Sequence, residues 1–142
     1  MDDPREVYHC LSCSSSNQLC IARHNALCSA LVKIVESIGI RSEPNPSFST
    51  PSQLDRVATP DVSVTINHIP FSIDLTVPES SCSSYHNRSI ADVLIARETQ
   101  KKALYANRIP LSNVFVPFAL DSTGNLSPES TKFITTTLIN GK

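Results

Sequence analysis

The sequence predicts a single mixed α/β domain in which a small sheet is flanked by helices. Two observations lead to this prediction. Helix signals and strand-like alternation follow one another in the order helix, hairpin, helix, strand, helix. The chain of 142 residues is long enough for one hydrophobic core and too short for a second sizeable one.

The first helix is expected over residues 21–38. Its apolar side chains recur at helical spacing, and Gly39 supplies a stop. These apolar residues are Leu27, Leu31, Ile34, Val35 and Ile38. Residues 42–59 hold prolines among serine, asparagine and threonine and lack any periodicity, so they are expected to form a loop.

A hairpin is expected over residues 62–77. Apolar side chains alternate with polar ones on both strands, around an interruption at residues 67–70. Because successive side chains of a strand point to opposite faces, Asp61 joins the polar face of the first strand and Asp74 that of the second. Both carboxylates are therefore expected to lie away from the main core.

The remaining sequence predicts a helix, a strand and a last helix. Residues 89–107 are expected to be helical and to carry a polar ridge. This ridge consists of Glu98, Lys101, Lys102 and Tyr105. Residues 114–116 predict a short buried strand ending before Pro117, and residues 122–125 predict a turn. Ser127 is the expected N-cap of the last helix, with Pro128 at its first position.

The composition excludes a global electrostatic role. The net charge is −1 and charged residues make up 18% of the chain, so DNA contacts have to come from a local patch. The local basic candidates are Arg23, Arg88, Arg97, Lys101, Lys102 and Arg108. No apolar run approaches the roughly 18 to 20 residues that span a bilayer, and five cysteines, an odd number, fit a reducing compartment. An intracellular protein is expected, with Cys28 and Cys82 as buried or loop thiols.

Asp61 and Asp74 support the most specific chemical hypothesis. Two carboxylates that converge from adjacent strands can hold Mg²⁺ or Mn²⁺, hard cations that prefer oxygen ligands. A nearby lysine would stabilise a phosphoryl transition state or position the attacking water, and Lys101 is the candidate. Asp74 also stands in the middle of a strand, where aspartate is disfavoured, so its presence calls for a reason.

Structural explanations stay open for the same residues. Asp61 follows Pro60 and fits an ordinary strand-entry turn, while Asp74 fits a solvated strand residue. Glu98 and Lys102 fit a helix surface pair that contributes about 0.2–0.5 kcal/mol.

Several segments of the chain occur in an order that resembles a known family. The first segments are His9-x3-Cys13, Arg23-His24-Asn25 opening a helix, Glu43-Pro44 and Pro60-Asp61. They continue with DLTVP at residues 74–78, then Glu98 with Lys101 and Tyr105, FVP at residues 115–117 and DSTG at residues 121–124. This order, covering roughly residues 9–124, is similar to the C-terminal endonuclease domain of site-specific non-LTR retrotransposons and related reverse-transcriptase-like proteins.

The resemblance implies a restriction-endonuclease-like fold of the PD-(D/E)XK type, a mixed sheet flanked by helices. It implies an enzyme that nicks one DNA strand by metal-dependent phosphodiester hydrolysis, with Asp61 and Asp74 as ligands of Mg²⁺ or Mn²⁺. The lysine of the standard motif lies two residues after the second acid, where this chain has Thr76, so Lys101 on the next helix would replace it. Additional candidates for the site are Glu43, Glu98 and Lys102.

The resemblance also implies partners and a nuclear location. The expected partners are DNA and a reverse transcriptase domain or RNA of the parent element, without a membrane. Residues proposed to contact DNA are Arg23, His24, Asn25 and Arg97; for the first three, a solvated turn of the helix is the alternative. A catalytically inactive nucleic-acid-binding or interaction module derived from such an element is the alternative function, favoured by the balanced charge and by Thr76.

Residues 1–20 are expected to form an N-terminal extension or a partial Cys-His knuckle, and residues 21–142 the restriction-endonuclease-like domain. His9 and Cys13 match the second half of the family's knuckle, whose first half is not seen in this sequence. Because a structural zinc site takes four ligands, Cys10 and Cys20 would have to complete it. A truncated or partial chain is the alternative expectation.

Overall fold

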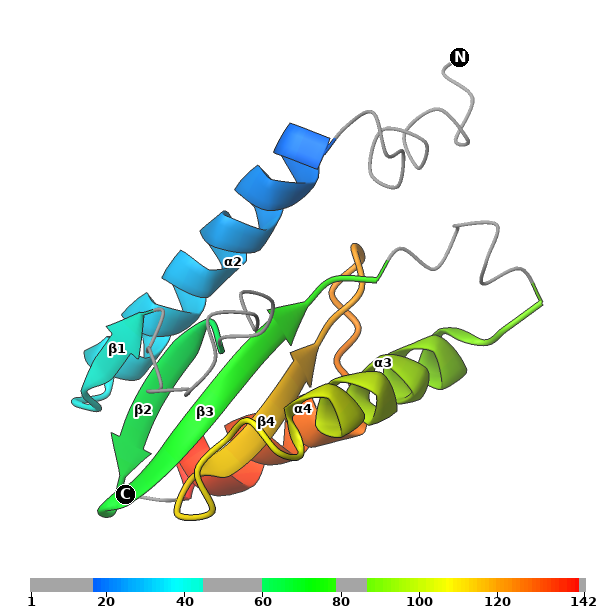
Figure 1. Ribbon diagram of the computed structural model, residues 1–142. Helices are drawn as coiled ribbons and strands as arrows, with labels where there is room; N and C mark the ends of the chain where they lie inside the picture. Colours follow the sequence, from blue (N-terminus) through cyan, green and yellow to red (C-terminus); the bar gives the residue numbers. More distant parts are fainter. Residues whose placement is uncertain (1–16, 45–59, 79–86, 141–142) are drawn as a thin grey trace.

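The computed structural model of the protein describes residues 17–44, 60–78 and 87–140. Within these residues a four-stranded mixed sheet is flanked by helices (Figure 1), which confirms the expected fold class. The helices are α2 (Asn17–Ser37), α3 (Ile90–Tyr105), α4 (Pro128–Lys132) and the π-helix η3 (Phe133–Ile139). The strands are β1 (Ser42–Pro44), β2 (Val62–Ile66), β3 (Ile69–Thr76) and β4 (Val114–Ala119).

The strands lie in the order β1-β2-β3-β4. β1, β2 and β3 pair antiparallel, whereas β4 runs parallel to β3. A parallel pair needs a long crossover connection, and the chain makes it through α3. β3 is therefore an inner strand with an antiparallel neighbour on one side and a parallel neighbour on the other.

β2 and β3 form the expected hairpin. Asn67 and His68 make its two-residue turn, with φ angles of 51° and 65°. Positive φ at both positions is the geometry that suits the twist of the flanking strands. Ile69 and Pro70 already belong to β3, so the second strand begins earlier than the sequence pattern indicated.

One face of the sheet carries the hydrophobic core and packs against α2 and η3. The alternate residues of β2, β3 and β4 point into this core. Its buried members are Leu31, Val35, Val62, Val64, Ile66, Ile73, Leu75, Val116, Phe118, Phe133 and Leu138. α2 begins at Asn17, four residues before the start that the sequence predicted, so it includes Cys20 and crosses the proposed boundary at residue 21.

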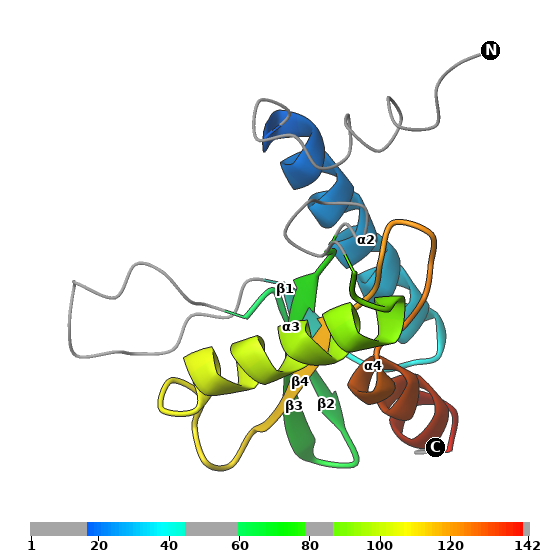
Figure 2. The same ribbon diagram turned by 90° about the vertical axis from the view of Figure 1, so that its right-hand side faces the viewer.

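The opposite face of the sheet is covered by α3, and its centre is polar. Tyr105 of α3 packs on Phe115, while Phe133 of η3 packs on Phe118, so these two helices lie on opposite faces of β4 (Figures 1 and 2). On β3 the exposed fractions of Ser72 and Asp74 are only 0% and 4%. The explanation of Asp74 as a solvated strand residue is therefore wrong, because α3 forms a second layer over this face.

β4 is longer than predicted, because its pairing with β3 continues through Pro117 to Ala119. The turn after it forms as expected around Asp121, with Gly124 at a φ of 92°. Ser127 accepts a hydrogen bond from the backbone N–H of Ser130, which confirms it as the N-cap of α4.

Candidate functional site

Asp61 lies beside the segment of β3 that carries Asp74. Its N–H donates to the carbonyl of Ile73 at 2.9 Å, and its carboxylate accepts from the N–H of Leu75, so Asp61 contacts both chain neighbours of Asp74. The carboxylate of Asp61 turns to His24 of α2, whereas that of Asp74 contacts α3 on the opposite face of the sheet. The prediction that both acids share the polar face of the hairpin is therefore wrong for Asp61.

Asp61 is held by its backbone surroundings and by α2. Its Oδ2 accepts a hydrogen bond from the N–H of Leu75 at 2.7 Å and lies 3.2 Å from Nε2 of His24. Burial raises the pKa of the Asp61 carboxyl and the charge of Asp74 adds to the rise, while the Leu75 and His24 hydrogen bonds oppose it. Two adjacent negative charges thus favour a cation at this position.

His24 connects α2 to the end of the hairpin. Its Nε2 lies 3.2 Å from both the Asp61 carboxylate and the carbonyl oxygen of Leu75. Both of these oxygens only accept hydrogen bonds, so Nε2 carries the N–H. The side chain therefore braces Asp61, and it lies within the second turn of a longer helix rather than at the helix start.

Asp74 is contacted by two side chains of α3. Nζ of Lys101 lies 2.8 Å from Oδ2, and the hydroxyl of Tyr105 donates to Oδ1 at 2.8 Å. Lys101 and Tyr105 are one helical turn apart and so project from the same side of α3. Burial raises the pKa of Tyr105 and the charge of Asp74 raises it further, so the phenol stays protonated as a hydrogen-bond donor.

Lys102 and Glu98 lie elsewhere and do not form the expected surface pair. Lys102 is exposed and its Nζ lies 3.2 Å from Oε1 of Glu129. Glu98 is buried, with 6% exposure, and accepts a hydrogen bond at 2.7 Å from the N–H of Glu129 near the start of α4. The predicted Glu98–Lys102 pair is wrong because both side chains turn towards α4.

The other sequence candidates are spread over the molecule. Glu43 is exposed on the edge strand β1, opposite Ser63. Arg97 donates to Gln100 at 3.0 Å on the surface of α3. Arg23 has Nε and Nη1 buried and, within the described residues, without a hydrogen-bond partner. His9, Cys10 and Cys13 lie outside the described residues, and Cys20 belongs to α2.

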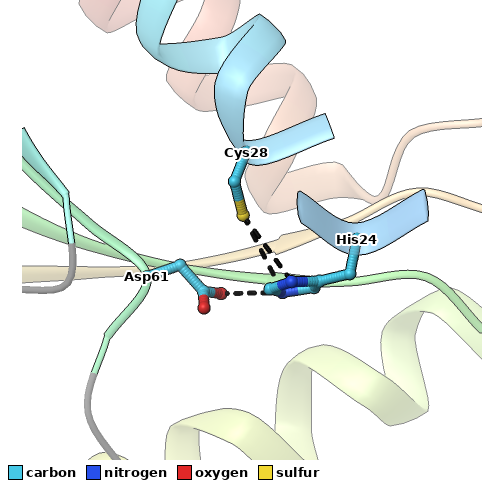
Figure 3. Close-up of side chains that lie close together, drawn as sticks. All are labelled: His24, Cys28 and Asp61. Carbon is cyan, nitrogen blue, oxygen red and sulfur yellow. Dashed lines mark hydrogen bonds and ion pairs between the residues drawn. The ribbon is translucent and has the colours of Figure 1, made fainter. Parts of the chain in front are cut away.

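A cleft of about 500 Å³ opens beside Asp61. His24, Asn25, Cys28, Ser29, Lys33 and Glu36 are among the residues that line it. Cys28 points towards the imidazole, with Sγ at 3.8 Å from Nε2 and 3.9 Å from Nδ1 of His24 (Figure 3). Burial raises the pKa of the Cys28 thiol to about 12, helped by the charges of Asp61 and Asp74.

Sequence reasoning missed the roles of Cys28 and Tyr105. Cys28 was expected only as a buried or loop thiol, and Tyr105 as a member of a polar ridge and of the family-like order, without a contact to Asp74. Each stands four residues after a side chain of the site, Cys28 after His24 and Tyr105 after Lys101. This spacing puts each pair on one side of a helix and was the available signal.

Within the described residues, His24, Cys28 and Asp61 form a group that could hold a metal ion, since one ligand atom of each lies within 4.8 Å of the others. Asp74 lies outside this group, and Lys101 offsets its negative charge.

None of the helices in the described part of the chain combines the length and apolarity that a membrane crossing requires. No family model and no curated protein matches this chain, so its function is inferred from these side chains.

Proposed function

We propose that this protein is a divalent-metal-dependent phosphodiesterase that nicks DNA, of the kind its sequence resembles among retrotransposon endonuclease domains. One observation carries the proposal: Asp61 is hydrogen-bonded to Ile73 and Leu75, the two neighbours of Asp74, and the amine of Lys101 lies 2.8 Å from Asp74. Two acids and a lysine are the groups that phosphodiester hydrolysis with Mg²⁺ or Mn²⁺ requires.

Each side chain has a distinct role in this proposal. Asp61 and Asp74 would hold Mg²⁺ or Mn²⁺, which supplies an activated water and stabilises negative charge on the phosphate. Lys101 adds a fixed positive charge near the scissile phosphate. His24 orients Asp61 and Tyr105 orients Asp74 through the hydrogen bonds described above.

Lys101 can take the place of the lysine that the standard motif has and this chain lacks. Thr76 stands where that motif has its lysine, yet Lys101 reaches the second acid from α3. This contact supports the replacement that the resemblance implied. DNA as substrate, a nuclear location and a reverse transcriptase domain as partner are parts of the same proposal.

The cleft beside Asp61 suits a DNA backbone. Lys33 and Asn25 line it, and both side chains can donate to phosphate oxygens. Arg23, from the same helix, has two buried nitrogen atoms that find no acceptor among the described residues. Because the net charge of the chain is −1, binding depends on such local donors rather than on a general attraction.

A plasmid nicking assay tests the proposal. Supercoiled DNA is incubated with the full chain in Mg²⁺, in Mn²⁺ and in EDTA, and the relaxed form is quantified. We expect nicking in either metal and none in EDTA. Asp61→Asn, Asp74→Asn and Lys101→Met should each lower the rate by about 100-fold or more, because each removes a group that acts on the transition state.

Lys102→Met is the matched control, since Lys102 neighbours Lys101 but pairs with Glu129. It should nick within about twofold of the wild type, since ion pairs of this exposed kind contribute little. Circular dichroism of every variant excludes unfolding as the cause of a loss. A wild-type chain that fails to nick, or acid variants that nick at the wild-type rate, would refute the enzyme.

A non-catalytic nucleic-acid-binding module is the second candidate. It is favoured by the burial of Asp74, which is 4% exposed with contacts from Lys101 and Tyr105 on its two oxygens. In that case the three groups form a structural cluster. DNA should then bind equally well with or without metal, with salt-dependent affinity and no cleavage.

A further inference from the structure

Three different metal-ligand types meet beside the cleft. A ring nitrogen of His24, Sγ of Cys28 and a carboxylate oxygen of Asp61 all lie within 4.8 Å of one another. Figure 3 shows the thiol and the imidazole descending from α2 towards the carboxylate at the start of β2. His24 and Cys28 are one helical turn apart, a spacing that fixes two ligands on one side of a helix.

The separations of these atoms are close to those of a zinc site. Around a tetrahedral Zn²⁺, ligand atoms at about 2.0–2.3 Å from the metal lie roughly 3.3–3.7 Å from one another. Here Sγ of Cys28 lies 3.8 Å and 3.9 Å from the two ring nitrogens of His24, and one ligand atom of each of the three residues lies within 4.8 Å of the others. Small side-chain movements would bring the three ligand atoms to the separations of a tetrahedral site.

The cleft supplies the open position that a three-ligand metal needs. Its volume of about 500 Å³ leaves room for water beside the three side chains, all of which are partly buried. Asp61 places negative charge beside Cys28, and a dication would offset that charge. As the metal binds, the thiol proton passes to solvent through the cleft, and the imidazole keeps its single proton on the ring nitrogen that does not bind the metal, which means a transfer to Nδ1 when Nε2 is the ligand.

We propose that His24, Cys28 and Asp61 form a site for a thiophilic divalent cation of the zinc class, with a fourth position open to water. Thiolate and imidazole ligands select such a cation over Mg²⁺, which prefers oxygen. Its ligands are different residues from those of the N-terminal Cys-His segment. It shares Asp61 with the proposed Mg²⁺ site.

The shared carboxylate gives the site a regulatory consequence that rests on the proposed function. Asp61 cannot serve a tetrahedral zinc centre and a magnesium centre with Asp74 in the same geometry, because the two cations differ in coordination number and bond length. Zinc therefore inhibits nicking by withdrawing Asp61 from the acidic pair.

Cobalt binding tests the site without reference to activity. The full chain is prepared with Cys10, Cys13, Cys20 and Cys82 all replaced by serine, which leaves Cys28 as the one thiol among the five cysteines. Added Co²⁺ should give a thiolate-to-metal charge-transfer absorption at one ion per chain, and Zn²⁺ should abolish it. Cys28→Ser should remove the band, while His24→Gln and Asp61→Asn should each weaken Co²⁺ binding by about tenfold or more.

Glu36→Gln is the matched control, because Glu36 lines the same cleft but lies outside the group of three. Its Co²⁺ affinity should equal that of the parent. Absence of the charge-transfer band overturns the proposal. So does a band whose affinity is unchanged in both His24→Gln and Asp61→Asn, since it would report a lone thiolate.

A second experiment tests whether the two metal sites share Asp61. In the same serine background with excess Mg²⁺, zinc should inhibit nicking, and Cys28→Ser should raise the zinc concentration for half inhibition by about tenfold or more. Inhibition that is unchanged in Cys28→Ser overturns the regulatory link. If the chain does not nick DNA at all, the proposed enzyme activity is refuted. The cobalt measurements then test the proposed metal site independently.

Discussion

Asp74 carries a buried carboxylate whose two oxygens are contacted by α3. Lys101 approaches one oxygen and Tyr105 donates to the other, each at 2.8 Å. A buried ion pair gains little over an apolar replacement of the whole pair, but removing one partner leaves an uncompensated charge. The energetic role of this cluster is therefore seen best when one of its partners is removed.

Lys101→Met is expected to lower the free energy of unfolding by about 1–3 kcal/mol, at the lower end of buried pairs because the lysine side chain is 24% exposed. Lys102→Met should cost less than about 0.5 kcal/mol, since its pair with Glu129 is solvated. Urea unfolding of the two variants measures the difference. Equal losses would mean that Asp74 does not depend on Lys101.

Asp121 organises the turn that follows β4. Its Oδ1 accepts from the N–H groups of Thr123 and Asn125 at 3.0 Å and 2.8 Å, and its Oδ2 from the amide of Asn125 at 2.9 Å. Burial raises the pKa of this carboxyl, but the hydrogen bonds from Asn125 and Thr123 outweigh it and hold the pKa below its ordinary value. The DSTG segment that contributed to the family resemblance thus has a structural role here.

Because its folded pKa is lowered, Asp121 contributes stability that is complete above the ordinary carboxyl pKa of about 3.9 and is lost as pH falls through the folded value. Asp121→Ala should lower the free energy of unfolding at neutral pH by about 1–3 kcal/mol. The variant should also lose less stability than the wild type between about pH 4 and pH 2. Thermal melts across this range measure both effects, and parallel pH profiles would contradict them.

At the residue scale, sequence reasoning singled out Asp61, Asp74 and Lys101, and the structure shows a contact between Lys101 and Asp74. Helical spacing put Lys101 on a neighbouring element. Alternation placed both acids on the polar side of the hairpin, which is wrong for Asp61, because its carboxylate turns to His24 of α2. It could not show how His24 approaches Asp61, because that contact joins side chains 37 positions apart in the chain. Long-range contacts of this kind leave no periodic signal.

At the scale of the elements, Glu98 shows how α3 stabilises the helix that follows β4. Its carboxylate accepts from the N–H of Glu129, at 2.7 Å, in the first turn of α4. The first N–H groups of a helix have no partner within the helix, and an acceptor there is favoured by the helix dipole as well. Glu98 thus acts as a cap supplied from another element.

Glu98→Ala is expected to lower the free energy of unfolding by about 1–2 kcal/mol, because it leaves the Glu129 N–H without this acceptor. Glu98→Gln keeps an oxygen in place and should cost less than the alanine variant. Urea unfolding of both variants provides the comparison. Equal losses would show that side-chain packing, and not the hydrogen bond, is responsible.

The main elements could be read from periodicity, whereas their edges could not. The hairpin, α3 and the Ser127 cap all followed from local patterns. β1 was missed because residues 42–44 fall in a proline-containing stretch without alternation, and they become a strand only by pairing with β2. β4 was predicted to end before Pro117, yet its pairing with β3 overrides the local signal.

At the scale of the whole molecule, the mixed topology assembles the site from distant parts of the chain. The hairpin supplies Asp61 and Asp74, α2 supplies His24 and Cys28, and the crossover helix supplies Lys101. The two helices lie on opposite faces of the sheet and meet the acids at its end (Figures 1 and 2). No single segment of the sequence contains the complete set of groups.

The crossover through α3 also sets the order in which these contacts form during folding. A two-residue hairpin closes locally in microseconds, so Asp61 and Asp74 meet early as two unneutralised charges. Lys101 arrives only when α3 docks and β4 joins β3, contacts that close a longer loop.

Lys101→Met should therefore leave the folding rate within about twofold of the wild type. Most of its stability loss should appear as faster unfolding, by about 5- to 100-fold. Stopped-flow refolding and unfolding in urea measure the two rates. A slower folding rate in Lys101→Met would mean that the lysine already offsets the repulsion of the two acids in the folding transition state.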